Sequence, residues 1–68
     1  MRTYLFTING NNTTEINYHT LPVMLSLVIS RVDKYYLEES LQSIRNLNEH
    51  GTVDVITYNG DTLTFCLK

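Results

Sequence analysis

Three side chains in this 68-residue chain could act as a base, a nucleophile or a metal ligand near neutral pH: His19, His50 and Cys66. A general base must lie within hydrogen-bond reach of a nucleophile or a substrate proton, and neither histidine has such a setting in the sequence. A metal site needs three or four ligands, and no short spacing between these residues arranges two of them in advance. We therefore expect no metal site, no cofactor and no enzymatic activity.

The other groups with possible chemistry are better explained by structure. Glu38 and Glu39 are adjacent, so on a helix their side chains diverge by about 100° and cannot work as a paired acid and base. The three glycines are isolated from one another, which excludes a glycine-rich phosphate loop. A single cysteine excludes an internal disulfide framework, and the expected compartment is the cytoplasm.

Charge argues against a nucleic-acid partner. The net charge is −2, and the five Lys and Arg residues form no basic stripe that could neutralise phosphates. Tyr4, Tyr18 and Tyr58 fall on expected strands and could stack on bases, so single-stranded nucleic-acid binding through tyrosines stays as the less favoured alternative. Core packing is the more ordinary role for Tyr4 and Tyr58.

No membrane or secretory segment is expected. The first twenty residues contain Asn and Thr where a signal peptide needs an apolar core. The longest apolar-rich stretch, residues 21–29, is too short to span a bilayer. These features favour a cytoplasmic protein without a membrane partner.

The first elements form a predicted hairpin. Residues 3–8 alternate in β-favouring types and predict a strand, and residues 15–19 alternate again through Ile16 and Tyr18. The polar segment 9–14 between them contains Asn-Gly, the strongest short signal for a tight turn, and predicts a longer or bulged loop.

Two helices are predicted in the middle of the chain. Thr20 and Pro22 mark the start of a helix over about residues 21–32, and Asp33 can cap a second helix. The second helix has an apolar stripe and is closed by Gly51 in the left-handed region. As an alternative, residues 23–32 form a fifth strand, and residues 34–49 form a single helix.

A second Asn-Gly dipeptide predicts a hairpin at the end of the chain. A two-residue loop at Asn59-Gly60 pairs Tyr58 with Asp61 and Ile56 with Leu63. This register divides the side chains into an inward, bulky face and an outward face of smaller residues. The expected inward residues are Phe6, Ile8, Ile56, Tyr58, Leu63, Phe65 and Leu67, and the expected outward residues are Leu5, Thr7, Val53, Val55, Thr57, Thr62, Thr64 and Cys66.

The predicted fold is therefore α+β. One domain, residues 1–68, contains a small antiparallel sheet of about four strands in two hairpins, with two helices between them packed on one face, in the order ββααββ. A chain this short buries only about 60% of the surface of its unfolded form, so leftover apolar surface calls for an explanation. We expect that such surface is covered by a partner.

The leading functional hypothesis is a non-enzymatic protein-binding module. The chain has seven Asn and no Ala, a bias typical of an AT-rich genome, so a phage- or mobile-element-encoded inhibitor of a host enzyme or defence complex is one form of it. Acidic groups suit a basic target, such as a nucleic-acid-handling complex. The candidate partner-binding residues are Tyr35, Tyr36, Glu38, Glu39, Gln42 and Glu49.

The alternative is a structural homo-oligomer, such as a homodimer without a separate ligand. Its expected contact is the outward face of the sheet, because the helices should cover only the other face. Residues Leu5, Thr7, Val53, Val55 and Thr57 represent this possible oligomer face. Only one residue of the Tyr35-Tyr36 pair can join the apolar stripe of its helix, so the other should be exposed.

Overall fold

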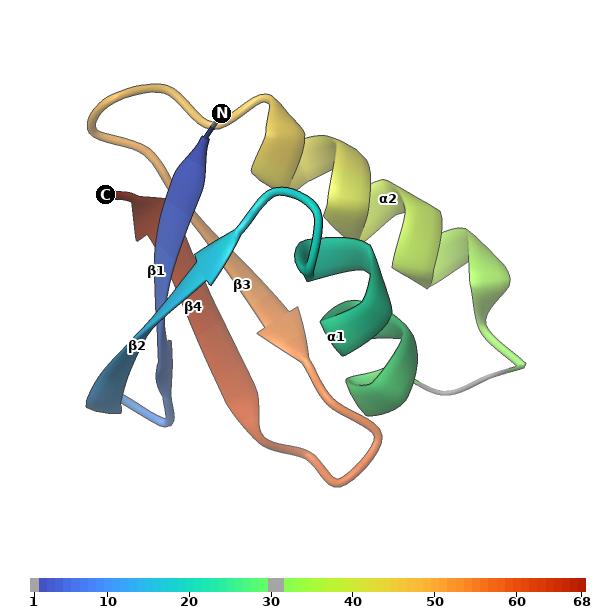
Figure 1. Ribbon diagram of the computed structural model, residues 1–68. Coiled ribbons are helices and arrows are strands. Elements are labelled where there is room, and N and C mark those ends of the chain that lie inside the picture. Colours follow the sequence, from blue (N-terminus) through green and yellow to red (C-terminus); the bar gives the residue numbers. More distant parts are fainter. Residues whose placement is uncertain (1, 30–31) are drawn as a thin grey trace.

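One antiparallel sheet and two helices make up the computed structural model, which describes residues 2–29 and 32–68 (Figure 1). The strands lie in the order β2-β1-β4-β3, so each hairpin supplies one inner and one edge strand. This arrangement confirms the predicted α+β fold and its ββααββ order. The elements are β1 (Thr3–Ile8), β2 (Asn11–Asn17), α1 (Leu21–Val28), α2 (Lys34–Arg45), β3 (Thr52–Ile56) and β4 (Thr62–Leu67).

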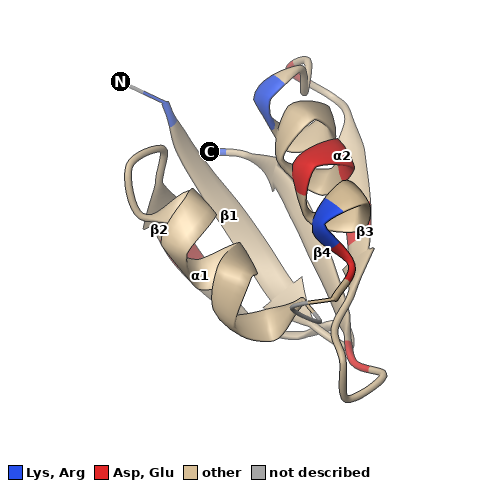
Figure 2. Ribbon diagram, turned by 90° about the vertical axis from the view of Figure 1, so that its right-hand side faces the viewer, with Lys and Arg blue, Asp and Glu red and all other residues tan. Residues whose placement is uncertain are grey.

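Both helices cover the same face of the sheet (Figures 1 and 2). The core lies between the two layers and includes an aromatic pair on the inner strands, Phe6 and Phe65, whose ring centroids are 5.3 Å apart. The buried apolar residues come from all six elements and the segments that join them: Tyr4, Ile16, Leu21, Leu25, Ile29, Ile44, Leu47, Val55, Leu63 and Phe65.

The first hairpin has a tighter turn than expected. Asn9 and Gly10 both have positive φ, 51° and 78°, as a type I′ turn requires, and Ile8 pairs directly with Asn11. The predicted irregularity follows the turn, because Asn12 also has positive φ and the register shifts there. The strand β2 therefore starts earlier than the predicted residue 15 and ends at Asn17.

The two predicted helices are present, and both are shorter than expected. α1 ends at Val28 because Ile29 turns to an extended conformation that places its side chain in the core. Because residues 23–28 are helical, the alternative strand over residues 23–32 is wrong for the residues that the structure describes. Residues 30–31, which belong to both predictions, lie outside the described residues. Asp33 caps α2 as expected, since its Oδ1 accepts the Tyr36 N–H at 3.0 Å.

The end of α2 differs from the prediction. The helix stops at Arg45, because the Leu47 N–H bonds to the Ile44 carbonyl in a tighter turn and Leu47 then enters the core. Gly51 lies six residues later and does not have the left-handed φ expected of it. An added Cβ at Gly51 would lie 2.9 Å from Asn48 Oδ1, at the end of a side chain that can shift, so neither φ nor a backbone contact requires glycine here.

The predicted register of the second hairpin is wrong by one residue. Val55 pairs with Leu63 and Ile56 with Thr62, so Val55 is fully buried while Ile56 is 48% exposed. Every β3 side chain is consequently on the face opposite to the expected one. Val53 and Val55, which were assigned to the outward oligomer face, lie on the face that the helices cover.

The physical reason for this register is Asp54. It alternates with Val53 and Val55, so the expected register would have placed its carboxylate in the core between the sheet and the helices. Burial of an unpaired charge costs far more than the exchange of Ile56 for Val55 as a core residue. In the observed register, Asp54 lies on the open face and its Oδ1 accepts the Thr64 hydroxyl at 2.8 Å.

Candidate functional site

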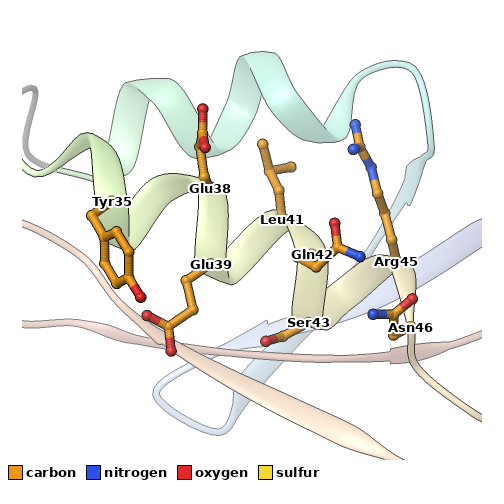
Figure 3. Close-up of a pocket in the computed structure, with 8 residues that line it drawn as sticks. All are labelled: Tyr35, Glu38, Glu39, Leu41, Gln42, Ser43, Arg45 and Asn46. Atoms are coloured by element: carbon orange, nitrogen blue, oxygen red, sulfur yellow. The ribbon is translucent and has the colours of Figure 1, made fainter.

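Four of the candidate partner-binding residues lie together on the outer face of α2. Tyr35, Glu38, Glu39 and Gln42 line a shallow, open depression of about 640 Å³ (Figure 3). Their spacing of three or four residues places them on one side of the helix. The opposite side faces the core through Ile44 and the buried Ser40. The amphipathic pattern of α2 therefore positions this group, which we call the α2 outer face.

Tyr35 is the prominent apolar group of this face. Its side chain is 81% exposed, whereas Tyr36, the next residue, is half-buried against the core. This difference confirms that only one tyrosine of the pair shares the apolar stripe. An exposed tyrosine offers apolar area and a polar tip to a partner, at a small loss of conformational entropy.

The other two candidates do not join this face. Tyr36 points to the sheet, where its hydroxyl oxygen accepts the Ile56 N–H at 2.8 Å. Glu49 lies after the end of α2, exposed in the turn before β3, and does not line the depression. The sequence placed Tyr36 and Glu49 with the others because it predicted a longer helix and gave no sign of the Tyr36 contact with β3.

The charge of the α2 outer face is negative in the middle and positive at its ends. Glu38 and Glu39 form an acidic band on α2, between Lys34 and Arg45 (Figure 2). Arg45 is held in place, since its guanidinium lies 5.2 Å from the centre of the Tyr18 ring. No ion pair joins either glutamate to another described residue. Both carboxylates are therefore available to a positively charged partner.

The open face of the sheet is polar rather than apolar. Leu5 and Thr7 lie on it as expected, but Val53 and Val55 do not, and Thr57 lies in the loop after β3. Strand alternation gathers six threonines on this face: Thr3, Thr7, Thr13, Thr52, Thr62 and Thr64. Without the two valines, the apolar residues of this face are Leu5, Cys66 and the half-exposed Ile56.

Exposed apolar surface is found instead on α1. Val23 and Leu27, one helical turn apart, are 61% and 68% exposed. The helix contains no charged residue, and it is entirely tan in Figure 2. Residues 21–29 are the longest apolar-rich stretch of the sequence, and the exposed residues of α1 provide leftover apolar surface of the kind expected for so short a chain.

A second, smaller depression lies where α1 and α2 meet the loop after β3. Its volume is about 380 Å³, and Tyr58 is 66% exposed beside it. Sequence reasoning placed Ile56 and Tyr58 in the core and so missed this surface, although the position of Asp54 in the alternation was the signal that could have corrected it. The lining residues are Ile29, Asp33, Tyr36, Ile56, Thr57 and Tyr58.

The residues with possible chemistry have ordinary surroundings. The His19 ring lies edge-on to Tyr18 with the centroids 6.2 Å apart, and the His50 N–H donates to Asn48 Oδ1. Cys66 is half-buried on the open face of the sheet. Across residues 2–29 and 32–68, no three His, Cys, Asp or Glu side chains gather in a way that could hold a metal ion.

Neither helix in the part of the chain that the structure describes has the length and apolar character needed to cross a membrane. No protein-family model matches the chain, and no significant match is found among curated proteins or among solved structures.

Proposed function

We propose that this chain is a non-enzymatic protein-binding module that contacts its partner through the α2 outer face. The observation that carries this proposal is the exposure of Tyr35 on the same side of one helix as Glu38, Glu39 and Gln42. A capped, amphipathic helix holds these groups on a rigid support, which lowers the entropy lost on binding.

The chemistry of this face favours a partner with a basic surface. The two carboxylates complement Lys or Arg side chains, and such charge complementarity raises the association rate and favours the correct partner. Tyr35 supplies the apolar contact that charges alone lack. An inhibitor of a host enzyme or defence complex, encoded by a phage or mobile element, is the form of this proposal that the Asn-rich, Ala-free composition favours.

A capture experiment with two tyrosine variants tests the proposal. The full chain, immobilised by a tag, is exposed to extracts of candidate host cells, and retained proteins are compared between the native chain, Tyr35→Ala and Tyr58→Ala. Tyr58 is the matched control, since it is also an exposed tyrosine but lines the separate, smaller depression and not the α2 outer face. We expect a partner that the native chain and Tyr58→Ala retain and Tyr35→Ala loses.

The salt dependence of the captured complex tests the role of the carboxylates. Charge complementarity predicts that retention falls as ionic strength rises, and that Glu38→Gln with Glu39→Gln reduces this salt dependence. Two results would count against the α2 outer face as the binding surface. One is that Tyr35→Ala retains the partner as well as the native chain does, and the other is that the native chain retains no specific partner.

A further inference from the structure

The two edges of the sheet differ in how their backbone groups are used. In an antiparallel ladder, the N–H and C=O groups of alternate residues point to the same neighbouring strand. The Tyr18 N–H donates to the Arg2 carbonyl. Because backbone groups alternate in direction along a strand, the N–H and C=O of Ile16, two residues earlier, also point to β1. The groups of Thr13 and Glu15 consequently point away from the sheet, at the free edge of β2.

The opposite edge is already occupied in part. Asp54 and Ile56 direct their backbone groups to the free edge of β3, because Val53 and Val55 pair with β4. At this edge the Tyr36 hydroxyl oxygen accepts a hydrogen bond from the Ile56 N–H, and α2 packs against β3. No such side chain reaches the backbone of Thr13 or Glu15 from any described residue. Thr52 and Asp54 also direct backbone groups outward at the β3 edge, with no partner among the described residues. That edge lies beside the acidic band of α2, whereas the β2 edge lies beside the uncharged α1.

The free β2 edge and the uncharged helix α1 lie in the same half of the molecule. Figure 2 shows α1 in front of the β2 and β1 half of the sheet and α2 in front of the β4 and β3 half. The acidic band of α2 is thus remote from the β2 edge. A surface made of a strand edge and an uncharged helix can meet its own copy without strong charge repulsion.

We propose that two copies of this chain pair through their β2 edges, antiparallel and around a two-fold axis, to form one continuous sheet. An axis perpendicular to the sheet keeps both helical layers on the same face, so the two α1 helices become neighbours across the interface. Val23 and Leu27 are the exposed residues that this arrangement brings toward the partner helix. The second copy then covers the leftover apolar surface of α1.

The register between the two β2 strands follows from the positions of their free backbone N–H and C=O groups. Residues that direct their groups outward must lie opposite one another, so Thr13 of one copy pairs with Glu15 of the other and Thr14 lies on the axis. A register centred on Glu15 would oppose two carboxylates, which is unfavourable. The Asn17 carbonyl already accepts the Thr20 N–H, so the pairing does not extend past Ile16. About four backbone hydrogen bonds form in this way.

Such a short strand pair makes a weak dimer, because stable interfaces bury more than about 1,200 Å² in total. Sedimentation velocity from micromolar to millimolar concentration measures it directly. We expect the average mass of the native chain to rise from 7.9 kDa toward twice that value as concentration increases. A mass that stays at the monomer value throughout this range would overturn the proposal.

Two proline variants locate the interface. Proline lacks the N–H and is tolerated where that group points out of an edge strand. Glu15→Pro blocks the β2 edge and should leave the chain monomeric. Asp54→Pro is the matched control at the β3 edge, removes a comparable side-chain contact, and should leave the dimer unchanged. Dimerisation of Glu15→Pro equal to that of the native chain would contradict the proposed interface.

Amide exchange gives a measurement that does not depend on a folded proline variant. Exchange at the Thr13 and Glu15 amides of the native chain should slow as concentration rises, while exchange at Asp54 should not change. Leu27→Arg, at an exposed position, should weaken the dimer several-fold without unfolding the chain. Tyr35→Ala should leave dimerisation unchanged, so failure of this proposal and failure of the proposed function are distinguishable.

Discussion

The two hairpins begin from the same dipeptide and reach different structures. In the first, Asn9 and Gly10 both have positive φ and form a two-residue loop. In the second, Gly60 alone has positive φ, 89°, and its N–H donates to the Thr57 carbonyl at 2.9 Å. The second loop is therefore a three-residue turn in which Gly60 forms a bulge. An Asn-Gly dipeptide indicates a turn, but it does not determine the length of the loop.

The residues around each dipeptide explain the difference. Thr57 Oγ1 accepts the Asp61 N–H at 3.0 Å, which stabilises the longer loop. Thr7 stands two residues before the first Asn-Gly dipeptide, as Thr57 does before the second, so the presence of this hydroxyl does not by itself determine the loop length. Asp54 adds a second requirement, because only the longer loop places it on the open face. Local side-chain bonding and the cost of a buried charge thus act together on the second hairpin.

The largest expected effect concerns which β3 residues face the core. Val55→Asp should unfold the chain, because an unpaired carboxylate in the core costs about 4 kcal/mol or more, close to the total stability of a domain of this size. Ile56→Asp should cost about 1 kcal/mol or less, since the residue is half-exposed. Urea unfolding followed by circular dichroism measures both. A larger loss of stability in Ile56→Asp than in Val55→Asp would mean that the second hairpin has the register of a two-residue loop.

The two asparagines should differ by a smaller amount. Asn9→Ala should lower the free energy of unfolding by about 2 kcal/mol, because Ala disfavours positive φ and two hydrogen bonds to the second hairpin are lost. Asn59→Ala should change it by less than about 0.5 kcal/mol, since Asn59 lacks positive φ. Equal losses, measured by thermal unfolding, would mean that both hairpins use the same turn.

Two tyrosine hydroxyls should have effects of opposite sign. Tyr36→Phe removes the acceptor for the Ile56 N–H at the β3 edge and should lower stability by about 1 kcal/mol. Tyr4, on β1, has a buried hydroxyl without a partner among the described residues, so Tyr4→Phe should raise stability by about 1 kcal/mol. Parallel urea titrations measure the two variants. A loss in Tyr4→Phe comparable to that in Tyr36→Phe would show that both hydroxyls are bonded.

The smallest effect is expected at the ion pair between β2 and the end of β4. Lys68 Nζ lies 2.7 Å from Glu15 Oε2, and both side chains are about half-exposed. Water and salt weaken such a pair, so Glu15→Gln should change the free energy of unfolding by less than about 0.5 kcal/mol. Thermal unfolding at low and high salt measures this, and a salt-independent loss above about 1 kcal/mol would contradict it.

Much of the fold was predictable because local patterns and tertiary packing agree. The alternation over Thr3–Ile8, the cap at Asp33 and the apolar stripe of α2 each act within a few residues, and each prediction was confirmed. The end of α2 and the register of β3 were not predicted correctly. Both depend on which side chain fills the core, and Leu47 and Val55 fill it for reasons that involve residues distant in sequence.

The candidate site was predictable to the extent that it is helical. The periodicity of α2 is sufficient to bring Tyr35, Glu38, Glu39 and Gln42 to one side, as the structure has them. The placement of Tyr36 depends on a hydrogen bond to a residue twenty positions away, and no sequence pattern indicates such a bond. The same limit applies to the two sheet edges, because their difference arises only once the four strands are assembled.

Proton nuclear Overhauser effects across the second hairpin test most directly that its loop differs from that of the first. The α-protons of opposite residues come close in pairs that are not hydrogen-bonded. We expect strong contacts between the α-protons of Asp54 and Thr64 and between those of Ile56 and Thr62. Contacts between Val55 and Thr64 and between Thr57 and Thr62 instead would mean a two-residue loop, and would contradict the assigned faces of β3.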